Sequence, residues 1–521
     1  MYTRIIKKGR SAAIKGAIKA ADVVCSTHGP GKNTVLISTV NQHGRLLPYP
    51  SGDGMMVAAN ISLKNLEEKI GSDIALSQAI RTAKQSGDNT TETLALMAGI
   101  LRKLNRFSVR RNVVKELNEA LESALELLKE NTVKVESIEE LVKIATVAAS
   151  NDPKIGKLVA ELAWKIGEHG TIYVKDGDGK ETTSELKPGY VIRPGLYSEQ
   201  FLSRSGPAGF SWASPSVALV DDIVYDYKQL NPIVKAFDEQ HFDRQTGNYN
   251  SSLVIFLREV DGNTLTGFTT TFMQMGKPII LVKVPGIYCL DVFEDLEALS
   301  GATIWSERKG NPLSELTKKG YGRKDVGFGE LEKLTADRDQ VTVFGKNVDE
   351  YAKQVLDFEF TDEPEREKER KARYSKLTKG VGYIHVGGSA DVQIVNLGQI
   401  IDDAQGATFN ALRHGYTVGG SYTLLKISES LLNTYGGRLL KSAIRESFGR
   451  KLRNSGHRWL FSPMGYYKPG YVFNMATGEF ENVSETEILD SAYSVECALR
   501  NSIAAACEII KAGYSIIWDN E

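Results

Sequence analysis

The sequence predicts a multidomain α+β protein, in which mostly helical terminal parts enclose a middle segment of alternating strands and helices. Its 521 residues are several times the roughly 150 residues of a typical domain. Apolar residues recur at helical spacing through most of the first 150 positions and again near the C-terminus. Between 215 and 305, short apolar runs alternate with helical stretches, which is typical of a parallel sheet with crossover helices.

The N-terminal part reads as a succession of helices interrupted by one strand. Apolar residues spaced three and four apart predict helices at 11–26, 66–83, 94–104, 112–129 and 137–149. A β-branched run predicts a strand at 33–40, and Gly, Pro, Asp and Asn residues predict turns at 28–31, 48–54 and 86–89.

The middle and the C-terminal part follow a different order. A strand at 171–174 leads into a turn at 176–179, where we expect a hairpin. Strands expected at 217–220, 253–257 and 278–284 alternate with helices at 228–238, 263–274 and 291–299. The charged run 363–376 predicts a solvated helix. A strand at 381–386 and helices at 397–414 and 491–513 complete the chain, and the similar texture of its two ends suggests one shared helical domain.

The composition excludes several classes of protein. Hydrophobic residues make up 41% and charged residues 25%, which excludes collagen-like and largely disordered chains. Because 64 Lys and Arg face 65 Asp and Glu, the chain has no overall charge that would attract nucleic acid or anionic lipid, and neither partner is expected.

The cysteines and the N-terminus indicate a reducing compartment. Cys25, Cys289, Cys497 and Cys507 lack the spacing of metal ligands, so we expect small buried thiols. The chain begins with a basic stretch without an apolar signal region, and no apolar run reaches the roughly 18 residues that span a bilayer. A cytoplasmic location without a membrane contact is expected.

The segment from Gly87 to Thr93 is the strongest candidate for a phosphate site. Its Gly-Asp-Asn-Thr-Thr run ends one predicted helix and starts another. The start of a helix exposes unpaired N–H groups and partial positive charge, which favour phosphate. Thr90 and Thr91 could add hydroxyl donors, and Asp88 could hold Mg²⁺. For this segment taken alone, ordinary helix capping is the simpler explanation.

Three further segments carry weaker signals. Gly29-Pro30-Gly31-Lys32-Asn33 offers backbone amides to an anion, although no Gly-x-x-x-x-Gly-Lys-Ser/Thr loop occurs in the chain. Gly52-Asp53-Gly54 is a turn that could present a carboxylate. Asp402-Asp403 lies within a helical pattern, where one of two adjacent acids must leave the solvated face and could orient a water for attack on phosphate. A surface turn or a surface acid pair is the simpler explanation in each case.

The order of these segments resembles a bacterial-type (group I, GroEL-like) chaperonin, a divergent and virus-encoded or otherwise specialised member. The resemblance extends over nearly the whole chain. The matching motifs are Thr27-His28-Gly29-Pro30, Gly52-Asp53-Gly54, Gly87-Asp88-Asn89-Thr90-Thr91, Asp402-Asp403-Ala404, Gly419-Gly420, Asn474-Met475-Ala476 and Ile488-Leu489-Asp490.

The resemblance implies three domains. A mostly helical equatorial domain would bind ATP and comprise 1–131 and 414–521. A small intermediate hinge domain would comprise 132–187 and 381–413, and an α/β apical domain that binds clients would comprise 188–380. Gly189 and Gly380 match the hinge glycines of the family, where the backbone freedom of glycine suits a pivot.

The resemblance also implies the roles of site residues. Asp88 would ligate Mg²⁺, Asp403 would activate the attacking water, and Asp53 would support both; K⁺ is a further candidate ion. The remaining contacts to ATP would come from Thr27, Gly29, Pro30, Gly31, Gly54, Thr90, Thr91, Gly419, Gly420, Asn474, Ala476 and Asp490.

Several positions depart from the family pattern. Ser421 and Asn89 each replace a glycine, Gly52 stands where the family has a lysine beside the phosphates, and the phosphate loop is one residue short. Client binding would involve apolar side chains on the apical domain, and a core role explains some of them equally well. These positions are Leu196, Phe201, Val234, Leu265 and Phe268.

Three functions remain open on the sequence alone. The first is an ATP-driven chaperonin that binds or encloses unfolded client proteins, as a homo-oligomeric heptameric ring with a co-chaperonin lid. The second is a passive or slow-cycling holdase, which the changes at Gly52, Asn89 and Ser421 favour. The third is an unrelated metabolic ATPase or kinase, which would be a monomer or dimer.

Overall fold

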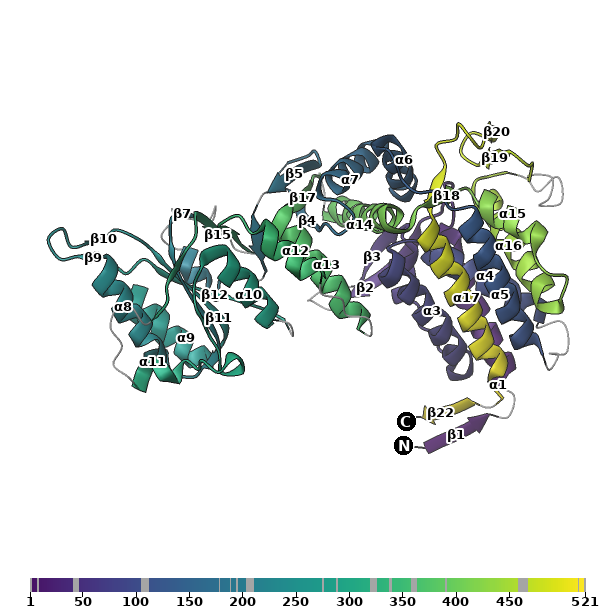
Figure 1. Cartoon of the computed structure of the whole chain (residues 1–521). Helices are drawn as coiled ribbons and strands as arrows, with labels where there is room; N and C mark the ends of the chain where they lie inside the picture. Colours follow the sequence, from purple (N-terminus) through teal and green to yellow (C-terminus); the bar gives the residue numbers. More distant parts are fainter. Residues whose placement is uncertain are drawn as a thin grey trace. The chain divides into compact units, whose positions relative to one another are not determined.

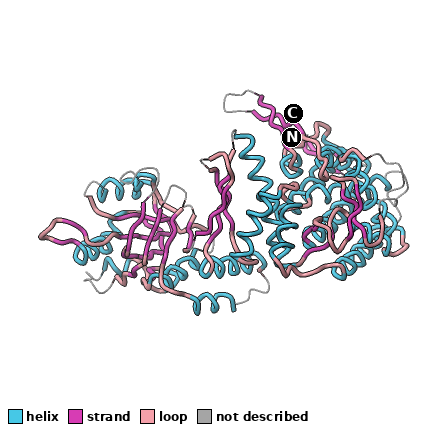
Figure 2. The backbone as a smooth tube through the Cα atoms, turned by 90° about the horizontal axis from the view of Figure 1, so that it is seen from above, coloured by secondary structure: helices cyan, strands magenta, loops and turns pink. Residues whose placement is uncertain are grey.

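The computed structural model divides into two compact units (Figures 1 and 2). The first comprises Met1–Glu168, Ile172–Glu185 and Tyr383–Glu521, and the second comprises His169–Thr171 and Leu186–Gly382. The described residues are 2–6, 9–40, 46–104, 112–177, 179–187, 189–193, 195–202, 210–273, 276–286, 289–318, 326–336, 340–357, 363–388, 391–457, 467–513 and 515–519.

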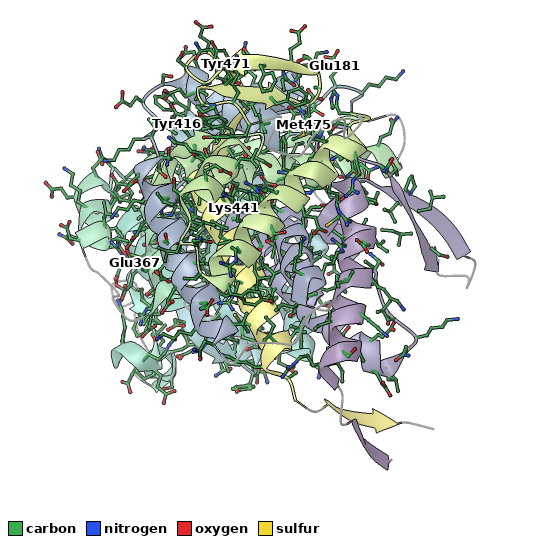
Figure 3. The ribbon with its side chains drawn as sticks, turned by 90° about the vertical axis from the view of Figure 1, so that its right-hand side faces the viewer. Glu181, Glu367, Tyr416, Lys441, Tyr471 and Met475 are labelled. Carbon is green, nitrogen blue, oxygen red and sulfur yellow. The ribbon has the colours of Figure 1, made fainter. Side chains whose placement is uncertain are left out.

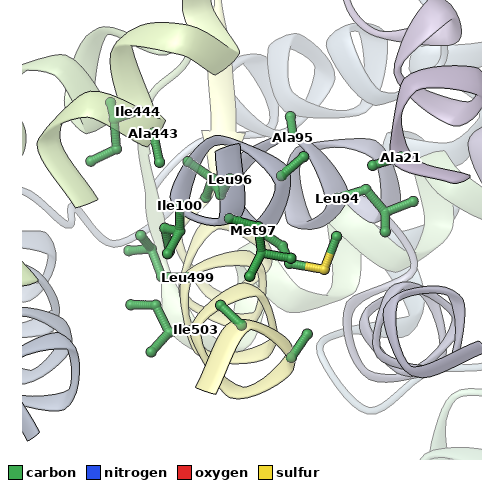
Figure 4. Packing of buried hydrophobic residues seen from close by; sticks show 14 of the residues in the cluster. Ala21, Leu94, Ala95, Leu96, Met97, Ile100, Ala443, Ile444, Leu499 and Ile503 are labelled. Atoms are coloured by element: carbon green, nitrogen blue, oxygen red, sulfur yellow. The ribbon is translucent and has the colours of Figure 1, made fainter. Parts of the chain in front are cut away.

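One hydrophobic core in the first unit holds helices from both ends of the chain. They are α1 (Gly9–Val24), α3 (Leu66–Ser86), α4 (Thr90–Leu104), α5 (Val113–Glu130), α15 (Tyr422–Ser430), α16 (Tyr435–Asn454) and α17 (Ala492–Lys511). Leu96 and Ile100 of α4 are completely buried. A helix that is apolar on every side needs neighbours all round. Figure 4 shows Ala21 of α1, Ile444 of α16 and Leu499 of α17 in the same cluster, so the expectation that the two ends share a helical core is confirmed.

Antiparallel strand pairs accompany this core. They are β1 (Tyr2–Ile6) with β22 (Ser515–Asp519), β2 (Val35–Val40) with β3 (Leu46–Ser51), β18 (Tyr416–Val418) with β21 (Leu489–Ser491), and β19 (Tyr471–Asn474) with β20 (Glu479–Asn482). Figure 2 shows the two chain ends side by side. The expected turn at 48–54 is wrong for Pro48 and Pro50, which lie in β3 opposite Ser38 and Leu36. Among the described strands β3 pairs with β2 alone, and an edge strand tolerates proline because one side needs no N–H donor.

A second core in the first unit surrounds α14. Its helices are α6 (Ile138–Ala148), α7 (Pro153–Ile166) and α14 (Asp391–His414), and its strands are β4 (Ile172–Asp176), β5 (Thr183–Lys187) and β17 (Val381–Val386). The hairpin expected at 176–179 is wrong, because β17 lies between β4 and β5 in the sheet. A strand from late in the sequence therefore separates the two neighbours in sequence; residue 178 lies outside the described ranges.

The second unit contains the expected parallel sheet. Its strands run in the order β12 (Ile279–Lys283), β11 (Leu253–Val260), β8 (Ser216–Val224) and β13 (Ile304–Trp305), with β14 (Gly329–Glu330) antiparallel on β8. The registers of β11 against β8 and β12 are parallel, which confirms the prediction. The helices are α8 (Asn231–His241), α9 (Gly262–Phe268), α10 (Cys289–Ser300) and α11 (Ser314–Lys318); residue 274, expected in a helix, is not described.

A second sheet and two more helices complete this unit. The antiparallel sheet has the order β6 (Tyr190–Ile192), β16 (Val341–Phe344), β15 (Lys333–Ala336) and β7 (Phe210–Ala213), and the helices are α12 (Asp349–Asp357) and α13 (Pro364–Thr378). The expectation that α13 is solvated is wrong on one face. Arg373 is buried there and donates to Asp295 of α10, which also accepts from Tyr190 at 2.7 Å.

The cysteine prediction is confirmed, since all four thiols are buried and unpaired with one another. Within the described residues, none of the helices is long and apolar enough to cross a membrane.

Candidate functional site

The end of α16 holds the loop that follows α1. Asn454 donates its side-chain amide to the carbonyl oxygens of Cys25 and His28, at 2.9 and 2.8 Å. The N–H of Gly31 donates to the hydroxyl of Ser455 at 3.3 Å, and a Cβ on Gly31 would lie 2.3 Å from the Ser455 Cα. Only glycine fits that close approach. The loop with Thr27, Gly29, exposed Pro30 and Gly31 is therefore pressed against a helix from 420 residues later in the chain.

The turn before α4 presents Asp88. Gly87 has a φ of 70° and ends α3, and Asn89 also has a positive φ of 65°. Asparagine tolerates the left-handed conformation better than most residues, which explains how it can replace a glycine here. The Asn89 N–H donates to Asp88 Oδ1 at 2.5 Å. Asp88 thus stands at the N-terminus of a 15-residue helix, where an anion is favoured.

Gly54 brings three of the expected segments together. A Cβ on Gly54 would lie 2.3 Å from Thr91 Oγ1 and 3.6 Å from Thr27 Oγ1, so glycine is required there. Asp53, the preceding residue, caps α2 (Gly54–Ala59) and accepts from the N–H groups of Met55 and Met56 at 2.9 and 3.0 Å. Asp53 is therefore a helix cap, and the residue that follows it, Gly54, lies beside Thr91 and Thr27. Thr90 is buried in the first turn of α4.

Helix α14 docks on the Asp88 turn. A Cβ on Gly406 would lie 2.4 Å from the Cα of Gly87, and Asn410 donates to the Ser86 carbonyl at 2.9 Å. Asp403 lies three residues before Gly406 and so shares its helical face. Asp402 is exposed and Asp403 is half-buried, as expected for an adjacent acid pair of which one member leaves the solvated face.

The three acids interact with one another. Burial raises the pKa of Asp403 well above its ordinary value, and the negative charges of Asp88 and Asp53 raise it further. Burial also raises the pKa of Asp88. The negative charge of Asp53 raises this pKa further, whereas the positive charges of Lys451 and Lys32 lower it. Asp53, Asp88 and Asp403 come from three separate segments and lie close enough for their charges to act on one another.

A buried ion pair that sequence reasoning missed lies beside these acids. Lys451 of α16 pairs with Glu92 Oε2 at 2.6 Å and donates to the Ser421 hydroxyl at 2.9 Å. Glu92 also accepts from the Ser447 hydroxyl at 2.6 Å and lies 3.1 Å from His28 Nε2. Burial alone would raise the pKa of Glu92, but Lys451 and His28 hold it well below the ordinary range. The one sequence signal was a lone acid inside the apolar α4.

The remaining residues expected at the site lie around Ser421. A Cβ on Gly419 would lie 2.7 Å from the Asp490 carboxyl carbon, and one on Gly420 would lie 3.8 Å from the Phe473 carbonyl oxygen. Asn474 accepts from the Ala476 N–H at 2.9 Å in the turn between β19 and β20; Figure 3 labels Tyr471 and Met475 on this segment. Burial raises the pKa of Asp490 to about 6, and Lys451 opposes that rise.

The acids fit a magnesium ion only with help from a ligand. Across the described ranges, no three His, Cys, Asp or Glu side chains lie close enough to hold a metal ion by themselves. Mg²⁺ is commonly held by one or two carboxylates together with phosphate oxygens. Burial is the main cause of the raised pKa values of Asp88 and Asp403, and a divalent cation at Asp88 would also relieve the repulsion among the acids that adds to it.

The apolar residues expected to bind clients are mostly core residues of the second unit. Phe201, Val234 and Phe268 are 5%, 2% and 0% exposed, so the expectation that they form an exposed patch is wrong. They pack into the core that covers the parallel sheet. Leu196 and Leu265 are partly buried against the same core.

The two expected hinge glycines lie close to the ends of the second unit in the sequence. Gly189 has a φ of 108° and Gly380 a φ of 75°, both in the left-handed region that favours glycine. The second unit's long segment runs from Leu186 to Gly382, so each glycine lies within three residues of a point where the chain passes between units.

Two of three comparisons with known proteins found relatives that match nearly the whole chain. No family model matches it. The chain is similar to the chaperonin GroEL of Methanoregula boonei, with 26% identity over 522 residues that cover 95% of this chain and 93% of the relative. Its fold is similar to crystal structures of the chaperonin gp146 from bacteriophage EL 2 (Pseudomonas aeruginosa) in the presence of ATP-BeFx, at 18% identity. One crystal form has a TM-score of 0.71 with 100% of both chains covered, and the other has 0.65 with 99% covered.

Proposed function

We propose that the chain is a divergent GroEL-like chaperonin in which Asp53, Asp88 and Asp403 form the centre of the ATP site. As a chaperonin it is an ATPase that assists the folding of non-native protein. The convergence of the three acids, produced by the docking of α14 on the Asp88 turn, carries the assignment of the site. This convergence argues against a passive holdase, in which nothing would keep the acids together.

We assign each acid a separate task in hydrolysis. Asp88 would hold Mg²⁺, which neutralises phosphate charge when bound, and Asp53 would support the metal and the attacking water. Asp403 would accept the proton of that water. A general base works best when its pKa lies near the working pH, and the raised pKa of Asp403 brings it closer to neutrality than an ordinary aspartate.

The other contacts to ATP are proposed from the same geometry. The loop of Thr27, Gly29, Pro30 and Gly31 and the start of α4 at Thr90 and Thr91 would surround the phosphates, together with Gly54. The base and ribose would lie beside Gly419, Gly420, Asn474, Ala476 and Asp490; Gly419 contacts Asp490, and the neighbouring Ser421 accepts from Lys451. K⁺ remains a proposed second ion.

We propose that hydrolysis moves an apical part about Gly189 and Gly380. The division into an equatorial part (1–131 and 414–521), an intermediate part (132–187 and 381–413) and an apical part (188–380) is supported by three separate hydrophobic clusters that follow it closely. Positive φ values at both glycines support their role as pivots.

As a chaperonin the chain binds unfolded clients and forms a ring oligomer. A heptameric ring, a co-chaperonin lid and a cytoplasmic location are proposals that the likeness to GroEL supports. The fold shared with a phage chaperonin supports a viral origin.

The adjacent acids Asp403 and Asp402 provide a matched test of the ATPase mechanism. Loss of a general base commonly costs a hundredfold or more in rate, so steady-state ATP hydrolysis should fall about 100-fold in Asp403→Ala. Asp402→Ala removes the same charge one residue away, on the exposed face, and should retain wild-type turnover. Electron microscopy of both variants checks that rings still assemble. Equal rates in wild type and Asp403→Ala would remove Asp403 from its role.

A further inference from the structure

The side chain of Lys32 extends over Gly52. A Cβ built on Gly52 would lie 3.4 Å from Lys32 Cε and 3.9 Å from Lys32 Nζ. From there the ammonium group reaches the turn between α6 and α7 and donates to the Ser150 hydroxyl at 2.8 Å. Gly52 has no left-handed backbone conformation, and a Cβ there would be in ordinary van der Waals contact with the lysine, so Lys32 packs directly over the Gly52 backbone.

The two lysines of the site act on different acids. The positive charge of Lys32 opposes the raised pKa values of Asp88 and Asp403, whereas that of Lys451 opposes those of Asp88 and Asp490. Asp88 is thus shared between them. Of the two, Lys32 is among the main charges that act on Asp403, and Lys451 is among those that act on Asp490.

The two lysines also differ in how their charges are compensated. Lys451 is paired with the buried carboxylate of Glu92 at 2.6 Å. Lys32 is exposed, and its hydrogen-bond partner Ser150 is a neutral hydroxyl. An ammonium group loses little binding energy when it exchanges a hydrogen bond to a neutral hydroxyl for one to an anion. The reason is that a hydrogen bond between two charged groups is stronger than one with a neutral partner.

We propose that Lys32 is the cation that binds the terminal phosphate of ATP, and that it exchanges its bond to Ser150 for the phosphate when ATP binds. This inference rests on the proposed ATP site and adds a residue to it. ATP would then be distinguished from ADP by a contact from the phosphate loop itself. Because Ser150 belongs to the α6–α7 turn, the same exchange would release that turn from the loop.

Nucleotide binding measured by calorimetry tests the proposal without relying on turnover. Wild type, Lys32→Ala and Lys32→Arg are titrated with ATP, ADP and AMP in the presence of Mg²⁺. A hydrogen bond to a charged group is worth about a tenfold change in affinity or more. We expect Lys32→Ala to bind ATP at least about tenfold more weakly, with ADP affected about threefold at most and AMP unchanged. Lys32→Arg should restore most of the ATP affinity.

Two further variants separate a local effect from a general loss of charge or of fold. Lys64→Ala removes an exposed lysine of the same unit, and its ATP affinity should match wild type. In the double variant Lys32→Ala/Gly52→Lys, truncation of Lys32 removes the three atoms nearest to a Gly52 Cβ, so the new ammonium should recover ATP affinity from position 52. Circular dichroism and ring size check the fold of each variant.

The outcomes distinguish this inference from the proposed function. Wild-type protein that does not bind ATP would contradict the ATP site as a whole. Wild-type binding together with an unchanged ATP affinity in Lys32→Ala would overturn the role of Lys32 alone. An equal loss for ATP, ADP and AMP would also overturn it, because the contact would not be with the terminal phosphate. Failure of the Gly52→Lys rescue would contradict the placement of the cation over Gly52.

Discussion

The backbones of Gly87 and Gly406 touch, and this contact is what brings Asp403 to Asp88. Each glycine occupies the space in which a Cβ on the other would stand, 2.4 Å from the facing Cα. Asn410 reinforces the contact by donating to the Ser86 carbonyl at 2.9 Å. Because a helix is rigid over one turn, the position of Asp403 follows from the position of Gly406. The distance between two backbones therefore controls where Asp403 lies relative to Asp88.

Gly406→Ala should separate binding from hydrolysis. The added methyl group would meet backbone atoms at 2.4 to 3.1 Å, so α14 must move away from the Asp88 turn by a few tenths of an ångström or more. A displacement of the general base of about 1 Å can cost about 100-fold in rate. We expect ATP hydrolysis to fall about 10- to 100-fold, whereas calorimetry should show ADP affinity within about threefold of wild type.

Gly398→Ala is the matched control for that variant. Gly398 lies in the same helix, and a Cβ there would meet no atom within 4 Å. Replacing an unconstrained helical glycine with alanine stabilises a helix by about 0.5–1 kcal/mol, so the melting temperature should rise slightly while turnover stays unchanged. Equal turnover in Gly406→Ala and Gly398→Ala would show that the close contact does not position Asp403.

The helices and the order of the site segments could be predicted from the sequence because both are local properties. The apolar spacing in α4 and the turn residues around Asp88 are visible within a few positions. Lys451 was missed because its partner Glu92 is more than 350 residues away, and the basic run at the end of α16 looks like an ordinary solvated face. The arrangement of Lys32 over Gly52 was likewise invisible, since a missing side chain acquires meaning only when its neighbour is known.

Burial of the residues expected to bind clients could not be read from the sequence either. Apolar spacing marks the face of a helix that is excluded from water, but it does not say whether another element or a client covers that face. Phe268 is an example. The helical pattern around it would be the same whether a client or the protein core covered the side chain, and in the structure the core buries it completely. The prediction for β3 was wrong for another reason. Its prolines indicate a turn unless the segment is known to be an edge strand.

The carboxyl group of Asp490 should give the stability of the protein a specific pH dependence. Burial raises its pKa from 3.8 to about 6, so between about pH 4 and pH 6 the folded protein keeps a proton that the unfolded chain has released. The contribution of Asp490 to the free energy of unfolding is therefore highest below pH 4. It falls as the pH rises to about 6 and stays constant at higher pH. Asp490→Asn has no such proton. The melting temperature of wild type relative to Asp490→Asn should decrease between pH 4.5 and 6.5, by an amount equivalent to about 2 kcal/mol.

The comparison between the two proteins isolates this group from all other titrations, because every other acid and base is common to both. A difference in melting temperature that is constant from pH 4.5 to 6.5 would contradict the raised pKa of Asp490. Saturating ADP should change the profile if the nucleotide lies against Asp490, and the same scans with ADP test that placement.

Gly380 and Gly276 allow the cost of backbone strain to be separated from the function of a hinge. Their φ values are 75° and 74°, and a Cβ on Gly276 would meet no atom within 4 Å. Alanine in a left-handed conformation costs about 1 kcal/mol at either position, so both variants should melt at similar temperatures below wild type.

Only Gly380→Ala should restrict movement of the apical part, because Gly276 lies far in sequence from the points where the chain passes between the units. Small-angle X-ray scattering with and without ATP measures that movement, which should shrink in Gly380→Ala and persist in Gly276→Ala. If both variants respond to ATP as wild type does, rotation at Gly380 is not needed, and the pivot must lie at Gly189 or elsewhere in the crossing segments.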